Sequence, residues 1–158
     1  MIKTKEIAKY GLVAALYIAL SLVLAPLSFG AIQMRLGEML KVLPFFNRKY
    51  TIALVIACVI VNLFSPLGMI DVIIGTANTI VCCLIVERVK HIALVPVLVA
   101  VISGLFIGFE LNLVFGLPFI YSAITVAIGQ LVVVTLGVIV FKTIQKKSKN
   151  LFKQIVGD

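Results

Sequence analysis

The sequence has few charged residues and no polar stretch long enough to form a separate soluble domain. Charged residues make up 13% of its 158 residues and hydrophobic residues 63%, whereas ordinary soluble domains contain about 45–50% hydrophobic residues. The mean hydropathy is +1.25. These values exclude an ordinary soluble protein and indicate one integral membrane domain over residues 1–158.

The sequence also lacks the motifs of the common enzyme and metal-binding classes. It has no phosphate-binding glycine loop, no nucleophile–histidine–acid set and no metal-ligand spacing, and its single histidine, His91, lies in a basic loop. Cys58, Cys82 and Cys83 stand in apolar runs without a CxxC spacing, which predicts small hydrophobic core residues. We therefore predict no enzymatic activity, no cofactor and no metal, and the chain cannot hydrolyse ATP by itself.

Long apolar runs dominate what remains. A membrane-spanning helix needs about 20 mostly apolar residues. Five stretches meet or approach this length, and a sixth, 33–46, is short and carries Arg35, Glu38 and Lys41. We predict an all-α bundle of six transmembrane helices, with the first retained rather than cleaved as a signal peptide. The five longer stretches are 7–28, 50–64, 68–86, 91–112 and 118–141.

The distribution of basic residues predicts the topology. With six spans and an inside N-terminus, 12 of the 14 lysines and arginines lie on the inner side, in agreement with the positive-inside rule. If 33–46 does not span and the N-terminus is outside, 11 of 14 are still inside. We prefer the first arrangement, with both termini cytoplasmic in a plasma membrane. It explains the net charge of +8 without nucleic-acid binding.

Polar and ionisable residues interrupt these apolar segments. An ionisable group within a membrane span costs roughly 2.5–3.5 kcal/mol on insertion scales, which makes it a candidate functional residue. Several such groups at one depth predict a polar pocket for a small molecule. The candidate substrate-binding residues are Gln33, Arg35, Glu38, Asn62, Asp71, Asn78, Glu110 and Asn112.

Each of these residues also has a structural interpretation. Asn62 and Asn112 could cap helices at the membrane interface, and Asp71 could form an ion pair with Arg35. Arg35 and Glu38 are three residues apart, which on a helix allows an intrahelical pair. In the functional alternative they line the mouth of the pocket, where a carboxylate can accept the paired N–H donors of a guanine-like edge.

Two further patterns concern helix faces. Asp71, Gly75 and Asn78 share one face, and the missing side chain at Gly75 could let a flat ring approach the backbone. Gln130 lies deeper and is interpreted as an interhelical hydrogen-bonding group.

Small residues form two stripes at four-residue spacing. Gly11, Ala15 and Ala19 make the first stripe, and Gly104 and Gly108 make the second. Such stripes let another helix approach closely.

The segments that carry these polar residues resemble the QueT family. The resemblance rests on Gln33-Met34-Arg35-Leu36-Gly37-Glu38 with Val42-Leu43-Pro44-Phe45-Phe46, on Val61-Asn62-Leu63-Phe64-Ser65, and on Asp71-Val72-Ile73-Ile74-Gly75-Thr76. It extends over nearly the whole chain. Members of this family are queuosine-precursor transporters, classed as substrate-binding (S) components of energy-coupling factor (ECF) transporters.

The resemblance implies a six-helix S-component fold without enzymatic activity of its own. It implies two kinds of partner, a transmembrane coupling (T) component and two ABC-type ATPases. The stripe Gly11, Ala15 and Ala19 matches the patch that docks onto the T component, and the implied mechanism is toppling of the whole S component in the bilayer. The implied substrate is a 7-deazaguanine, such as queuine or its aminomethyl precursor. That precursor is a cation, which favours a pocket with Glu38, Asp71 or Glu110.

Other functions remain open from the residues alone. An S component for another flat, polar vitamin would need the same features. A proton-coupled carrier would use Asp71 or Glu110 as the protonated group, although the sequence shows no obvious inverted repeat. A membrane scaffold would use the small-residue stripes for assembly and would leave the polar cluster unexplained.

Overall fold

The computed structural model describes residues 4–24 and 34–156, and the ordered elements in this part of the chain are helices joined by turns and short loops. The all-α prediction is confirmed for these residues. The elements are α1 (Thr4–Val23), η1 (Leu36–Val42), α3 (Leu43–Phe46), α4 (Tyr50–Asn62), α5 (Met69–Val86), η2 (Ile92–Leu94), α6 (Val95–Phe115), α7 (Phe119–Lys147) and α8 (Lys149–Val156).

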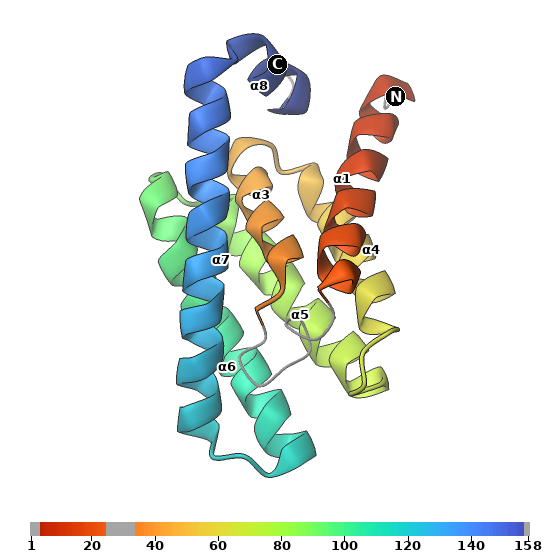
Figure 1. Ribbon diagram of the computed structural model, residues 1–158, viewed down its shortest axis with the longest axis vertical. Helices are drawn as coiled ribbons and strands as arrows, with labels where there is room; N and C mark the ends of the chain where they lie inside the picture. Colours follow the sequence, from red (N-terminus) through yellow and green to blue (C-terminus); the bar gives the residue numbers. More distant parts are fainter. Residues whose placement is uncertain (1–3, 25–33, 157–158) are drawn as a thin grey trace.

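The helices run between two ends that differ in charge (Figure 1). The turns at residues 63–68 and 116–118 contain no lysine or arginine, and we call the end where they lie the neutral end. Gly116 closes α6 there in the left-handed conformation with φ 66°, which glycine adopts without a Cβ clash. The first turn of α1 and the whole of α8 lie at the opposite end (Figure 1), which we call the basic end.

Four helices among the described residues are long and apolar enough to cross a membrane, namely α1, α5, α6 and α7. α4 has 13 residues, whereas η1 and α3 have seven and four. At about 1.5 Å per α-helical residue and 2.0 Å per 3₁₀ residue, each of these two segments is about 20 Å long, short of the ~30 Å hydrocarbon core. A membrane-type helical bundle is thus confirmed, while the predicted number of six spans is not.

The η1–α3 segment lies inside the bundle, between α1 and α7 (Figure 1). Close packing of backbone against backbone holds it there. A Cβ at Gly37 would lie 2.8 Å from the carbonyl oxygen of Tyr17 in α1, and one at Gly137 of α7 would lie 3.1 Å from the Cα of Met39. Both glycines therefore permit a helix-to-helix distance that larger residues would prevent.

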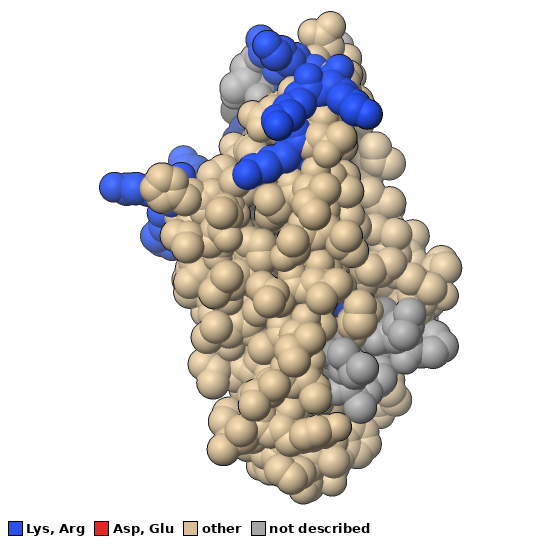
Figure 2. Space-filling model, turned by 60° about the vertical axis from the view of Figure 1, so that its left-hand side comes forward, with Lys and Arg blue, Asp and Glu red and all other residues tan. Residues whose placement is uncertain are grey.

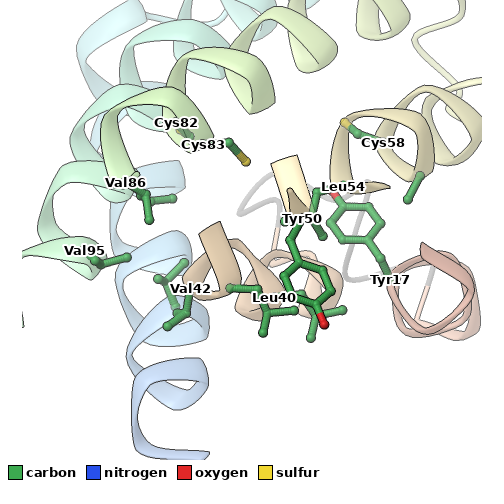
Figure 3. Close-up of a cluster of buried hydrophobic side chains, with 14 of the residues drawn as sticks. Tyr17, Leu40, Val42, Tyr50, Leu54, Cys58, Cys82, Cys83, Val86 and Val95 are labelled. Carbon is green, nitrogen blue, oxygen red and sulfur yellow. The ribbon is translucent and has the colours of Figure 1, made fainter. Parts of the chain in front are cut away.

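The larger hydrophobic core packs around η1 and α4 (Figure 3). It includes Tyr50 at the start of α4 and Val86 at the end of α5, which places it toward the basic end. Tyr17, Leu54, Cys58, Cys82 and Cys83 are buried within it, and all three cysteines are free thiols. The prediction that the cysteines are core residues is confirmed by this burial.

The outer faces of the long helices carry large exposed apolar side chains. Ile52 of α4, Ile73 of α5, Leu105 of α6 and Ile128 of α7 are all more than half exposed. Soluble monomers rarely expose continuous apolar surface of this extent, whereas lipid tails cover such a surface favourably. The exposed faces are therefore those expected for contact with lipid.

On the face shown in Figure 2, the lysines and arginines gather toward the basic end. α8 lies across this end with Lys149 and Lys153 exposed, and its other face is attached to the bundle. Phe152 makes an edge-to-face contact with Phe46, with ring centroids 5.1 Å apart, and the Asn47 amide donates to the Val156 carbonyl over 2.7 Å. α8 thus closes the basic end over the junction between α3 and α4.

Candidate functional site

The first group of buried polar residues joins three elements near the neutral end. Arg35 precedes η1 in an extended conformation, and its Nη1 donates to Asn62 Oδ1 at the end of α4 over 2.6 Å. Its Nη2 lies 3.4 Å from Asp71 Oδ2 in the first turn of α5. The Asn62 amide donates to the Asp71 carbonyl oxygen over 2.9 Å. We call Arg35, Asn62 and Asp71 the neutral-side set.

The second group lies farther along η1. Lys41 forms an ion pair with Glu38, and the Tyr17 hydroxyl of α1 donates to the same carboxylate. Side chains three residues apart nearly eclipse in a 3₁₀ helix, and this geometry brings Glu38 and Lys41 together. We call Tyr17, Glu38 and Lys41 the basic-side set, because η1 runs from Arg35 toward the basic end.

A third polar contact connects α5 with α6. The Asn78 amide and the Ser103 hydroxyl lie within hydrogen-bond distance, with 3.2 Å between Asn78 Nδ2 and Ser103 Oγ. The Cys82 thiol lies 3.4 Å from Asn78 Oδ1 and 3.8 Å from Ser103 Oγ. These are buried side chains, so the contact fixes the spacing between the two helices in the middle of the bundle.

A small cavity lies among these groups. Its volume is about 10 Å³, which is room for about one water molecule. Residues from η1, α5, α6 and α7 line it together with Arg35. The lining residues are Arg35, Glu38, Gly75, Asn78, Thr79, Ile107 and Gln130. In this closed form the bundle therefore presents a carboxylate, a guanidinium and two amides to a space smaller than any organic ligand.

Gly75 lines this cavity, but much of the space beside it is taken by protein. A Cβ at Gly75 would lie 2.6 Å from Asn62 Nδ2 and 2.6 Å from Asp71 Oδ1. The missing side chain therefore lets the neutral-side set pack against the backbone of α5. A flat ring could reach this backbone only after those side chains move.

Glu110 of α6 differs from the other buried carboxylates. It is 0% exposed, and neither carboxylate oxygen has a hydrogen-bond partner in the described part of the chain. It lies one helical turn from Ile107, which lines the cavity, and it interacts electrostatically with Asp71 and Arg35. Glu110 thus stands beside the neutral-side set without being bonded to it.

The structure brings together most of the residues that the sequence singles out. Arg35, Glu38, Asn62, Asp71 and Asn78 lie within the connected polar interior described above, and Glu110 lies at its edge. The structural alternative of an intrahelical pair between Arg35 and Glu38 does not describe the structure: the two side chains have separate partners, because Arg35 precedes η1 in an extended conformation. The alternative ion pair between Asp71 and Arg35 is present.

Two predicted site residues lie elsewhere. Asn112 is exposed, and its amide donates to the Leu117 carbonyl over 2.6 Å, so it stabilises the turn between α6 and α7. The position of Asn112 therefore fits the interpretation as a helix cap better than the interpretation as a pocket residue. Gln33 lies outside the described residues.

Some polar residues of this interior were not among the predicted site residues. Tyr17 and Lys41 complete the basic-side set, and Ser103 bonds Asn78. A signal for Ser103 exists in the sequence, because Ser103, Ile107 and Glu110 follow one face of a helix. Tyr17 had a weaker signal, since a tyrosine in an apolar helix also occurs as an interfacial residue.

The small-residue stripes differ in their surroundings. Gly11, Ala15 and Ala19 are exposed, and an apolar groove of about 370 Å³ lies beside Gly11, between α1 and α4. Gly108 packs instead against α7, where a Cβ would lie 2.8 Å from the Cα of Ala123. The second stripe is thus used inside the chain, whereas the first remains accessible.

The described residues contain no cluster of histidine, cysteine or acidic side chains that could hold a metal ion. Their chemistry is that of hydrogen bonding and charge pairing. Long apolar helices around a buried polar interior define a multi-pass membrane protein, and the charged groups at its centre mark its candidate functional site.

Comparison with known proteins gives the family. The family model described as QueT transporter matches residues 7–146, and the chain belongs to this family. A curated relative, the "Queuosine precursor transporter QueT" of Lactococcus lactis subsp. cremoris, is 32% identical over 161 residues, which cover 92% of this chain and 95% of the relative. The resemblance seen in the sequence is confirmed. No solved structure matches the chain.

Proposed function

We propose that this chain binds a queuosine precursor of the 7-deazaguanine class and carries it across a membrane. The name of the curated relative supports the substrate. The observation that carries the proposal is the cavity lined by Arg35, Glu38, Asn78 and Gln130. It combines charged and amide groups in the interior of a membrane protein, where such groups are costly and therefore mark a functional site.

The lining residues match the polar edge of a guanine-like base. Such a base presents a carbonyl acceptor beside N–H donors. Asn78 and Gln130 can each donate and accept, and the guanidinium of Arg35 can donate to a carbonyl. Ile107 offers an apolar contact for the ring. These groups come from the residue before η1 and from α5, α6 and α7, so a bound base would be held by several elements at once.

Binding requires the cavity to open. Pockets for small molecules have volumes of about 300–1,000 Å³, far above the 10 Å³ of this one. We propose that α6 and α7 move together away from α5 at the neutral end. Gly104 and Gly108 allow α6 to pack tightly against α7. Between α5 and α6, by contrast, the described side chains form hydrogen-bonding contacts at Asn78–Ser103 and Cys82–Ser103.

We further propose that the chain is the S component of an ECF-type importer, with a T component and two ATPases as partners. The family resemblance suggests this assembly, and the exposed stripe of Gly11, Ala15 and Ala19 supports it. The stripe lies on α1 beside an apolar groove, where a partner helix could pack closely. ATP hydrolysis in the partners would then drive the import.

A pair of matched substitutions tests the docking surface. Ala15→Leu should abolish uptake in cells while the purified chain still binds its substrate, because Ala15 is exposed on α1. Gly108→Leu should lose both binding and uptake, since α7 fills the space there. Normal uptake by the Ala15→Leu variant would contradict the docking surface.

The proposed orientation places the basic end and both termini in the cytoplasm. The lysines and arginines gathered at this end agree with the positive-inside rule. The buried carboxylates Asp71 and Glu110 then lie toward the outer side, where a substrate would enter. In this arrangement six segments of one domain cross the plasma membrane. The second of them is the short segment that contains η1 and α3.

The central experiment is equilibrium binding to the purified full-length chain. We expect 7-aminomethyl-7-deazaguanine to bind in isothermal titration calorimetry. Asn78→Leu should weaken binding by at least about tenfold, the value of one buried hydrogen bond left without its partner. Asn150→Leu on exposed α8 is the matched control and should bind normally. No binding to the wild-type chain, or binding only of an unrelated vitamin such as riboflavin, would contradict the proposed substrate.

A further inference from the structure

The buried charges of the bundle do not balance. Among the described residues, three buried carboxylates belong to Glu38, Asp71 and Glu110, and two buried cations to Arg35 and Lys41. Lys41 pairs with Glu38, and Arg35 lies 3.4 Å from Asp71. Each cation is therefore already used by a neighbouring carboxylate. Glu110 remains without such a partner.

An ionised carboxylate in this position needs a positive charge. Glu110 is 0% exposed, and both of its oxygens lack a hydrogen-bond partner among the described residues. A buried charge is strongly unfavourable unless it is paired and hydrogen-bonded. A ligand that brings its own cation would supply both the charge and the missing hydrogen bonds.

We propose that Glu110 binds a protonated amine of the substrate, and that the transported compounds are cationic 7-deazaguanines. This inference rests on the proposed function for the base itself. It selects Glu110 from the three carboxylates that were candidates for this role in the sequence, because Glu38 and Asp71 already have cationic partners. A 7-deazaguanine with an uncharged substituent leaves Glu110 unpaired and is a poorer ligand.

The position of Glu110 relative to the cavity fits such an arm. Ile107 lines the cavity, and Glu110 lies three residues farther along α6, which is about 4.5 Å along the helix axis toward the neutral end. A base beside Ile107 and Asn78 therefore needs a substituent that extends in this direction. An aminomethyl group ends in a nitrogen that can donate a charge-assisted hydrogen bond to a carboxylate.

Two ligands that differ in this one group test the proposal. 7-Aminomethyl-7-deazaguanine carries the amine, and 7-cyano-7-deazaguanine has the same ring with an uncharged nitrile. Calorimetric titrations would compare both ligands on the wild-type chain, on Glu110→Gln and on Glu6→Gln. Glu6 lies at the basic end, where it pairs with Lys49, and serves as the control for removal of a carboxylate.

The wild-type chain should prefer the aminomethyl ligand. Glu110→Gln should weaken its binding by about 10- to 100-fold, the contribution of one charge-assisted hydrogen bond, and should leave binding of the cyano ligand nearly unchanged. Unchanged cyano binding also shows that the variant is folded. Glu6→Gln should behave as the wild type with both ligands.

Four results would overturn the inference. Equal binding of both ligands to the wild type, or an aminomethyl affinity unaffected by Glu110→Gln, would show that Glu110 does not bind the amine while the site for the base stands. An equal loss for both ligands would make Glu110 a structural residue. If neither ligand binds the wild-type chain, the proposed function fails and this inference fails with it.

Discussion

The two buried charged sets of the bundle share one chemistry but differ in completeness. In the basic-side set, the Glu38 carboxylate receives both the Lys41 ammonium and the Tyr17 hydroxyl, so its charge is compensated inside the protein. Around the neutral-side set, Arg35 serves both Asn62 and Asp71, and the adjacent Glu110 has no partner among the described residues.

This difference separates a structural role from a ligand-binding role. The Glu38–Lys41 ion pair lies within η1, and the hydrogen bond from Tyr17 to Glu38 connects η1 to α1; this compensated group gains nothing from a further charge. Glu110, beside the neutral-side set but outside it, has no hydrogen bond to the described residues, so its stabilisation depends on another molecule. The same residue types therefore stabilise the fold in one place and favour binding in the other.

The largest effect is expected for Arg35→Met. This change leaves Asp71 buried without its cation and removes the donor to Asn62, so the junction of η1, α4 and α5 loses both interactions. Breaking a buried pair in this way destabilises a protein by about 3–5 kcal/mol, and we expect the upper end of this range together with loss of substrate binding. Thermal unfolding in detergent measures the stability, with the exposed Arg48→Met as control. An unchanged unfolding temperature would contradict the role of Arg35.

A somewhat smaller loss is expected for Lys41→Met. Glu38 would lose its cation but keep the hydrogen bond from Tyr17, which places the cost at the lower end of the same range, about 3 kcal/mol. The double variant Lys41→Met with Glu38→Gln removes both charges and should be more stable than Lys41→Met alone. If the double variant is less stable than the single one, the two residues do not act as a compensating pair.

The smallest effect on stability is expected for Glu110→Gln. Because the carboxylate has no hydrogen bond to lose within the described part of the chain, its replacement by a neutral amide of similar shape should leave the unfolding temperature of the ligand-free protein unchanged or slightly raised. Thermal unfolding without ligand measures this directly beside Arg35→Met. A large destabilisation would show that Glu110 has a structural partner, and the contrast between the two sets would then disappear.

Much of the architecture followed from sequence patterns. Apolar runs predicted the helices, and acidic residues within them predicted that Glu38, Asp71 and Glu110 lie inside. These groups are buried because apolar residues flank them on both sides in the sequence. Such a local pattern can be recognised without knowledge of the fold. The segment 33–46 is short by its sequence and was still counted as one of six spans, and this number is not confirmed, since four helices of the described residues are long and apolar enough to cross a membrane.

The pairing of the polar residues was harder to predict, because it depends on local backbone geometry and tertiary packing. The spacing of Arg35 and Glu38 favours a pair only if both residues are helical, and Arg35 is extended. The pair of Glu38 with Lys41 depends on a 3₁₀ helix, whose short repeat aligns residues three apart. Asn112 shows the same limit, since its exposed position is fixed by the turn at Gly116.

A disulfide between α5 and α6, next to the cavity residue Asn78, tests the central claim most directly, namely that substrate binds where α5 separates from α6. Ser103 Oγ lies 3.8 Å from the thiol of Cys82, so Ser103→Cys places two sulfurs close enough to be linked with little movement. Ser103→Cys in a Cys82→Ala background is the control that cannot form this bond.

We predict that the oxidised Ser103→Cys chain fails to bind 7-aminomethyl-7-deazaguanine and that reduction restores binding, whereas the control binds equally under both conditions. Equal affinity of the oxidised and reduced forms, with the disulfide confirmed by mass spectrometry, would show that the substrate does not enter between these helices and would contradict the proposed site.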